Sequence, residues 1–458
     1  MILLTAPLLS VIDVFIINVA IPSIKKGIHA TDAEVQLIIA GYLLSYATFQ
    51  ITSGRAGDYL GRKKVFFWGM FFFTLTSCLC GLSNTALQLN IARFFQGVSA
   101  ALMLPQTIAY IQVIFPEHTE RTKAVGFYGI TLGVASILGQ FLGGYLSASH
   151  FAIPGWRLIF FINLPVGIPA LVATAIFLEE TPKNTTGKFD YLGVTILTFA
   201  LISLIFPLIQ GREQGWPLWS IIMLVSSFLI FYYFVTDQKK KLRLQKATLI
   251  NMDLFKIRDF NIGLLCVLFY FMMHTSYLLA CSVYLQSGLG IGAYQSGLFF
   301  VAFGICFTIS SFLSIRYVVK YGKKVLQFGT FIIIITFVMQ AYFFTLNATH
   351  FSIYALMALF GLGSGLVLPS LMNIALKSIP HHFAGAASGV YSTFQQASSA
   401  LGISIIGGVF YYVVDLPGKL PAYPKAFHTA LFAEIICLIV VSYLLYILPE
   451  KKHGHKNN

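Results

Sequence analysis

The most informative shortage in this 458-residue sequence is charge, because only 10% of its residues are charged while 57% are hydrophobic. A soluble domain averages about 25% charged residues, so the composition predicts a protein built for lipid. Lysine and arginine exceed aspartate and glutamate by 30 to 16. This excess does not indicate nucleic-acid binding, because the basic residues gather in short loops between apolar runs, as membrane topology requires.

Cysteine is also scarce, and the motifs of several chemistries are missing. The six cysteines all lie inside apolar segments, where we expect buried small hydrophobic residues and no metal or redox site. The sequence has no G-x-x-x-x-G-K-[ST] loop, which argues against ATP as the driver, and no H-E-x-x-H or G-x-S-x-G pattern. We therefore expect no enzyme, no cofactor and no metal.

Long apolar runs dominate the sequence. A membrane-spanning helix needs about 20 apolar residues, and runs this long and uniform satisfy their backbone polar groups in lipid as helices. Residues 1–22 lack a basic start and a cleavage site, so we expect a span there and no signal peptide. The fourteen predicted spans are 1–22, 34–53, 66–83, 86–113, 123–147, 157–178, 190–209, 217–235, 259–285, 292–315, 325–346, 350–376, 383–412 and 427–448.

The distribution of basic residues predicts the orientation of these spans. With both termini in the cytoplasm, most lysines and arginines fall in inner loops, as the positive-inside rule requires. Arg93 lies inside a predicted helix. The outer side then holds only Lys25, Lys26, Arg157, Arg212, Lys419 and Lys425.

The chain also contains an internal repeat. The segment FQGVSAALMLP ending at Pro105 resembles FGLGSGLVLP ending at Pro369, and at the same offset Gly143-Gly144 falls on Gly407-Gly408. Weak repetition between halves is typical of transporters that rock two bundles about a midplane site. We therefore expect an N-terminal six-helix bundle, two inserted helices, a cytoplasmic linker, a C-terminal six-helix bundle and a cytoplasmic tail, over residues 1–180, 181–236, 237–258, 259–450 and 451–458.

Asp13 and Arg93 are ionisable residues at positions where charge is costly. An acid in the middle of a span costs roughly 2.5–3.5 kcal/mol on insertion scales. From the helix rise of about 1.5 Å per residue, both lie ~10–14 Å below the outer surface, so they can form an ion pair, directly or through water. Ions within the membrane indicate function by default, whereas the alternative is a static pair that fixes helix packing.

Polar stripes on two further helices predict walls of a substrate cavity. Tyr270, His274 and Tyr277 share one face of the ninth span, where a histidine near neutrality can bind or relay protons. The alternative is a hydrogen-bonded histidine that only packs. A second stripe lies on the second span, at Tyr42, Tyr46 and Gln50, as cavity lining or as contacts between helices. For Glu434, in the last span, we expect a structural or interface role.

The turn between the second and third spans contains G-x-x-x-D-x-x-G-R-K-K, from Gly54 to Lys64, which resembles the signature loop of the major facilitator superfamily. IDVFIINVAIP (residues 12–22), ARFFQG (92–97) and WRLIFFINLPVG (156–167) resemble motifs of its fourteen-helix drug:proton antiporter branch, the QacA/EmrB type. The resemblance runs over essentially the whole chain. It implies an all-α polytopic membrane protein with the major facilitator fold, two six-helix bundles plus two inserted helices.

The resemblance also implies roles for single residues. Asp58, with Gly54, Gly61 and Arg62, would form an inner gate, in which Asp58 meets the N-terminus of the helix beginning near residue 383. The alternative is that this turn only sets topology. Arg93 would influence proton transfer, and Asp13 would bind the proton or position the first helix.

One residue departs from the motif of this branch. Its fifth helix carries Gly-Pro two residues before Gly-Gly, whereas this chain has Gln140 in place of the proline. The usual kink is then not expected. We include Gln140 among the cavity candidates.

The sequence thus predicts a proton-coupled exporter of hydrophobic, including cationic, small molecules, embedded as a monomer in a bacterial cytoplasmic membrane. Its expected partners are the substrate, protons and the lipid bilayer, with a periplasmic adaptor as a further partner and no nucleic acid. Two alternatives stay open. One is a proton symporter or an exporter of a single metabolite such as a siderophore, which Gln140 favours; the other is a membrane sensor or scaffold that transports nothing.

Overall fold

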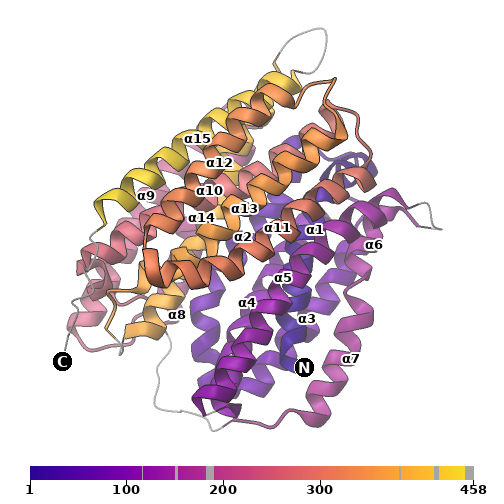
Figure 1. Ribbon diagram of the computed structural model, residues 1–458. Helices are drawn as coiled ribbons and strands as arrows, with labels where there is room; N and C mark the ends of the chain where they lie inside the picture. The colour runs from indigo at the N-terminus through magenta and orange to yellow at the C-terminus, as the bar shows by residue number, and fades with distance from the viewer. Residues whose placement is uncertain (116, 150–152, 182–189, 381–382, 417–421, 449–458) are drawn as a thin grey trace.

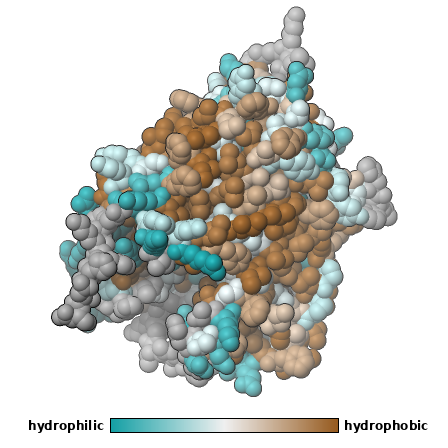
Figure 2. All heavy atoms as spheres, in the orientation of Figure 1, coloured by the Kyte–Doolittle hydropathy of each residue, from teal (hydrophilic) through white to brown (hydrophobic). Residues whose placement is uncertain are grey.

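The computed structural model describes the chain except residues 116, 150–152, 182–189, 381–382, 417–421 and 449–458. Within the helices, the side chains of six further residues are not described: Arg55, Asp58, His118, Thr122, Val319 and Ala384. The described part contains 14 helical spans that are long and apolar enough to cross a membrane, as the sequence predicts. The protein is therefore a multi-pass membrane protein. Apolar residues cover the middle of the helices, and hydrophilic residues gather toward their ends (Figure 2).

The spans form two bundles with an inserted hairpin (Figure 1). The N-terminal bundle contains α1 (Thr5–Gly27), α2 (Asp32–Leu60), α3 (Arg62–Leu82), α4 (Ala86–Ile114), α5 (His118–Ala148), α6 (Gly155–Phe161) and α7 (Leu164–Phe177). The hairpin is α8 (Tyr191–Glu213) and α9 (Leu218–Arg243). The C-terminal bundle contains α10 (Arg258–Val283), which continues as the π-helical turn η3 (Tyr284–Gly288), α11 (Ala293–Tyr321), α12 (Lys324–Phe343), α13 (His350–Leu376), α14 (Ala384–Val414) and α15 (Tyr423–Ile447). Short 3₁₀ turns, η1 (Ile2–Leu4) and η2 (Met252–Lys256), precede the first helix of each bundle.

Helix pairing confirms the internal repeat. In the first bundle α1 packs on α5 and α2 on α4; in the second, α10 packs on α14 and α11 on α13. The bundles meet through α5 with α11 and α2 with α14, and α8 packs on both α2 and α14. At the first contact, a Cβ on Gly144 would lie 2.9 Å from the Cα of Gly297, so both glycines are needed for this close approach.

One predicted span is broken. The sequence predicts a single helix over residues 157–178, but the structure divides it into α6 and α7 at Ile162 and Asn163. The reason is Pro165 in the first turn of α7, which has no N–H to continue the hydrogen bonding of α6. The break places the Asn163 side chain in the interior of the N-terminal bundle, where it is fully buried.

The two bundles are tied together at one end. Three hydrogen bonds between described residues run from one bundle to the other. Gln286 Nε2 donates to the carbonyl of Val19 (2.8 Å), and Gln36 Nε2 donates to the carbonyl of Ile403 (2.8 Å). Thr393 Oγ1 donates to the carbonyl of Ala47 (3.0 Å). These contacts run from the end with the α1–α2 loop to about the middle of the helices.

Candidate functional site

A cavity of about 480 Å³ lies between the two bundles. Its walls come from α1, α2, α4 and α5 on one side and from α10, α11, α13 and α14 on the other. These are the helices that the repeat relates to one another, so the cavity lies on the pseudo-symmetry axis. Of the predicted cavity residues, Tyr42, Tyr46 and His274 line it.

Asp13 and Arg93 form a direct ion pair beside this cavity. Arg93 Nη1 lies 2.5 Å from Asp13 Oδ2, and the two side chains are 1% and 0% exposed. The pair joins α1 to α4, as the estimate of equal depth from the sequence predicts. Because a buried pair is stable only when its remaining polar atoms are satisfied, the surrounding hydrogen bonds decide its strength.

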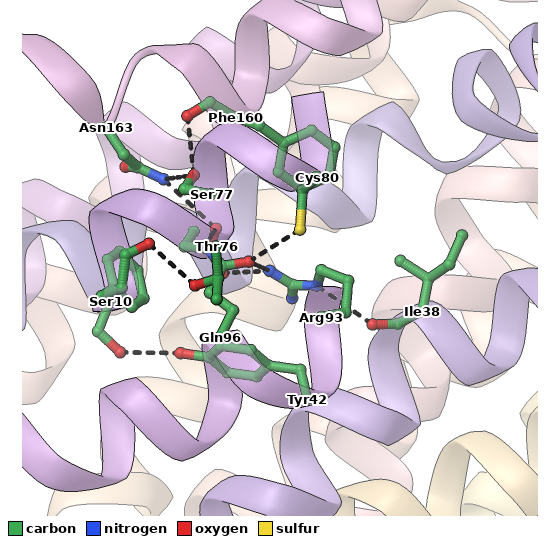
Figure 3. Close-up of polar contacts among 12 residues, drawn as sticks. Ser10, Ile38, Tyr42, Thr76, Ser77, Cys80, Arg93, Gln96, Phe160 and Asn163 are labelled. Atoms are coloured by element: carbon green, nitrogen blue, oxygen red, sulfur yellow. Dashed lines mark hydrogen bonds and ion pairs between the residues drawn. The ribbon is translucent and has the colours of Figure 1, made fainter. Parts of the chain in front are cut away.

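Gln96 and Ile38 supply such hydrogen bonds (Figure 3). Gln96 Nε2 donates to Asp13 Oδ1 (2.9 Å), and Gln96 Oε1 accepts from Arg93 Nη1 (2.8 Å). Arg93 Nε donates to the carbonyl of Ile38 on α2 (3.3 Å). The pair and Gln96 thus form a closed ring of hydrogen bonds in which both carboxylate oxygens have donors.

Residues of α3 and of the α6–α7 break contact this ring of hydrogen bonds. Asn163 Nδ2 lies 2.8 Å from Ser77 Oγ and 3.5 Å from Asp13 Oδ1, and Ser77 Oγ donates to the carbonyl of Phe160 (2.8 Å). Cys80 Sγ lies 3.5 Å from Gln96 Oε1. Gln96 and Asn163 were not among the predicted site residues, although they belong to the ARFFQG and WRLIFFINLPVG motifs.

Tyr42 and Arg93 lie between Asp13 and the cavity. The guanidinium of Arg93 lies 4.3 Å above the Tyr42 ring, and the Tyr42 hydroxyl is 3.1 Å from Ser10 Oγ. Arg93, Tyr42 and Ser10 belong to the cavity wall, whereas Asp13 lies behind them and does not. The cavity therefore meets the cationic member of the pair and not the anionic one.

On the opposite wall, His274 is surrounded by aromatic rings. Its ring stacks between Tyr270 (centroids 5.8 Å apart) and Phe360 (5.9 Å), and its Nδ1 has no hydrogen-bond partner. Tyr270 and Tyr277 share its helix face but do not line the cavity. The Tyr270 hydroxyl lies 3.4 Å from the carbonyl of Ser364, and Tyr277 accepts from Gln340 Nε2 (2.7 Å), so both are part of the core of the C-terminal bundle.

The two predicted glutamines also lie off the cavity wall. Gln140 is 1% exposed in the contact of α5 with α11, and neither atom of its amide has a hydrogen-bond partner. Gln50 is partly buried on α2, and its Oε1 has no hydrogen-bond partner. Of the seven predicted cavity residues, the structure therefore brings only Tyr42, Tyr46 and His274 together around the cavity.

The predicted inner gate lies at the α2–α3 turn. Gly61 has φ +105°, and a Cβ there would lie 2.7 Å from the Glu180 carboxylate, so this position requires glycine. Glu180 accepts from the backbone N–H of Lys63 (3.1 Å), which ties the turn to the end of α7. Arg62 Nη1 lies 3.4 Å from the carbonyl of Ala109, and Gly54 faces open space. The Asp58 side chain, which the prediction places against the start of α14, lies outside the described residues.

Glu434 occupies the interface predicted for it. It is completely buried where α15 packs on α10, and its Oε1 accepts from Ser276 Oγ at 3.1 Å. Its Oε2 has no hydrogen-bond partner. The described residues form no cationic contact with this carboxyl group.

Comparison with known proteins agrees with this architecture. The chain is 32% identical over 418 residues, 90% of its length and 72% of the relative's, to a Streptomyces coelicolor protein described as "Probable actinorhodin transporter". It is 29% identical to the "Multidrug transporter protein MdtP" of Bacillus subtilis (89% and 74% covered) and 27% identical to the "Multidrug resistance protein Stp" of Mycobacterium tuberculosis (87% and 73% covered).

Solved structures share the fold. The crystal structure of a D-xylose-proton symporter superposes with a TM-score of 0.68 at 14% identity, over 98% of this chain and 97% of that one. The sequence model of the "Major Facilitator Superfamily" matches residues 3–403. From this match and the curated relatives, the chain belongs to the Major Facilitator Superfamily.

Proposed function

We propose that this protein is a proton-coupled exporter that moves hydrophobic small molecules out of a bacterial cell by alternating access. The observation that carries the proposal is the cavity between two pseudo-symmetric bundles, with a buried Asp13–Arg93 pair beside it. The names of two relatives, "Multidrug resistance protein Stp" and "Tetracenomycin C resistance and export protein", support the export direction.

By the positive-inside rule, the basic α2–α3 turn supports a cytoplasmic position for that end of the helices. The hydrogen bonds that Gln286 and Gln36 make between the bundles lie toward the opposite end, which supports an inward-facing conformation that receives substrate from the cytoplasm. In it Asp13 is paired with a guanidinium, which is the arrangement expected after the proton has been released inside.

The proton cycle follows from the contacts of the pair. In the outward-open state a proton from outside would bind Asp13 and break its ion pair with Arg93. Release inside restores the pair, because a guanidinium favours the charged carboxylate. Substrate then binds the deprotonated state, so that each inward proton is exchanged for one outward substrate. Coupling requires only that the two states differ in substrate affinity.

The α2–α3 turn would close the inner end in the outward-facing state. Gly61 lets the chain turn there, and Arg62 and Asp58 would then meet the C-terminal bundle. This assignment rests on the resemblance of the turn to the family signature and on the backbone conformation of Gly61.

The test uses purified protein in liposomes that contain a pH-sensitive dye, with an imposed pH gradient. We expect substrate-triggered proton movement in wild type and its loss in Asp13→Asn. Asp253→Asn, which removes a carboxyl group from the linker paired with Lys256, is the matched control. Proton movement that survives Asp13→Asn would remove Asp13 from the coupling. If folded wild-type protein moves no protons with any of the neutral, cationic and anionic candidate substrates, multidrug export is contradicted.

A further inference from the structure

The charges on the cavity wall limit which substrates the cavity can bind. None of the described residues that line it is Asp or Glu. Asp58, whose side chain is not described, is twelve residues along α2 from the wall residue Tyr46, about 18 Å at the ordinary helix rise. The nearby acid, Asp13, is shielded by Arg93, Tyr42 and Ser10, and both its oxygens already accept hydrogen bonds.

The cavity therefore offers a cationic substrate no counter-charge. The positively charged group on its described wall is Arg93. Aromatic rings can attract a cation, but the Tyr42 ring already holds the Arg93 guanidinium. An organic cation that leaves water for this wall loses hydration and gains no carboxylate.

For an anionic substrate the difficulty is how its binding is coupled to the proton. Protonation of Asp13 would leave Arg93 unpaired and make the wall more positive, so an anion would bind the proton-loaded state more tightly. Proton and anion would then travel in the same direction, as in symport. Exchange, as proposed above, requires the proton to weaken substrate binding.

An uncharged substrate avoids both problems. The wall combines aromatic rings, such as Tyr46, Tyr128 and Phe271, with neutral donors and acceptors at Asn18, Gln395 and Gln396. Rings favour flat apolar surfaces, and amides both donate to carbonyl groups and accept from hydroxyl groups. When Asp13 binds a proton, the freed guanidinium would bring an unpaired, hydrated charge to the wall and weaken the binding of such a molecule.

We infer that the cavity selects uncharged, flat aromatic molecules that carry hydroxyl and carbonyl groups, and that it discriminates against lipophilic cations. This inference rests on the proposed export function and narrows the substrate class of the same cavity.

The test is a binding measurement on purified wild-type protein with one aromatic scaffold in three forms. An anthraquinone would carry a neutral hydroxyethyl, a cationic trimethylammonioethyl or an anionic sulfonatoethyl group, and binding would be followed by quenching of protein fluorescence at pH 7.5. We expect the neutral form to bind at least tenfold more tightly than the cation. Equal or tighter binding of the cation would overturn the inference.

A gain-of-function variant sharpens this test. Gln396→Glu places a carboxylate on the wall with almost no change of shape, and should tighten binding of the cation at least tenfold relative to binding of the neutral compound. Gln245→Glu, at an exposed position after α9, is the matched control and should change neither. Gln395→Glu is a second variant if the first does not fold. No gain for the cation in a variant that still binds the neutral form would contradict the inferred role of wall charge.

Transport separates this inference from the proposed function. If the neutral anthraquinone binds but drives no proton movement in liposomes, proton exchange is refuted and the inferred selectivity for neutral molecules stands. Proton exchange driven equally well by the cation would keep the export function and refute the selectivity.

Discussion

Removing one partner of the Asp13–Arg93 pair should be far more damaging than removing both. Arg93 is 1% exposed, and a guanidinium cannot escape burial by losing its proton. Asp13→Asn therefore leaves a buried charge without a partner, which lowers the free energy of unfolding by about 3–5 kcal/mol. In the double variant Asp13→Asn/Arg93→Gln no charge is left, and most of this loss should be recovered.

The converse single variant should depend on pH. Arg93→Gln leaves a buried carboxylate, and a carboxylate can become neutral by binding a proton. Each unit of pH makes that protonation about 1.4 kcal/mol easier. The penalty of Arg93→Gln should therefore shrink as pH falls from 7 to 5, whereas the penalty of Asp13→Asn should stay constant.

Both effects can be measured by denaturant unfolding in mixed micelles at pH 7 and pH 5. We expect a coupling energy of at least 2 kcal/mol between the two positions from the double-mutant cycle. Strictly additive penalties, or equal pH dependence of both single variants, would refute the account of the pair as an isolated buried ion pair. The double variant should fold and still fail to couple substrate to protons; coupling at the wild-type level would reduce the pair to a packing element.

Three further predictions concern charges outside the cavity. Glu434→Gln keeps an acceptor for Ser276 and should unfold within about 1 kcal/mol of wild type, because a carboxyl group buried without a cation is best neutral; a larger loss would mean that Glu434 carries charge in the cycle. Burial opposes ionisation of Asp190, but hydrogen bonds from Gln238, Lys241 and Gly193 outweigh it and lower its pKa. Asp190 Oδ2 also accepts a hydrogen bond from the backbone N–H of Leu249 in the linker (3.0 Å). Its stabilisation of the linker should therefore be full at pH 7 and 5 and be lost only as pH falls below about 4. There, hydrogen exchange of residues 244–257 in wild type should match that in Asp190→Asn. Arg212 of α8 reaches Gln36 (3.4 Å) and Asp415 (3.9 Å). Arg212→Gln should increase the population that is open at the end with the α1–α2 loop by up to about fivefold. Distances between spin labels on α5 and α11 would show this change.

Much of the fold was readable from the sequence because lipid leaves few alternatives. A run of about 20 apolar residues has to be a helix, so all fourteen spans were predicted, and the repeat around Pro105 and Pro369 predicted two related bundles. The break at Asn163 was not predicted, although Pro165 was visible, because a proline near the start of a helix and one that breaks a helix look alike in sequence.

The site was predicted in part, for a related reason. Charge in a span is costly, so Asp13 and Arg93 stood out, and their equal depth predicted their contact. Neutral residues such as Gln96 and Asn163 carry no such signal. Helix periodicity placed Tyr270, His274 and Tyr277 on one face, but a face wide enough for three rings meets both the cavity and the core. Only the packing of α10 against α13, with the bond from Gln340 of α12 to Tyr277, decides that His274 faces the cavity and Tyr277 does not.

The charge of the substrate also determines what drives export. If an uncharged molecule leaves as one proton enters, each cycle moves one net positive charge inward. Both parts of the proton gradient then act: about 2.3 kcal/mol for every 100 mV of membrane potential and about 1.4 kcal/mol for each unit of pH difference. A monovalent cation exchanged for one proton would move no net charge and would use the pH difference alone. If the cavity wall, whose described residues include no accessible carboxylate, rejects cations, it also commits the exporter to substrates whose exchange the membrane potential can drive.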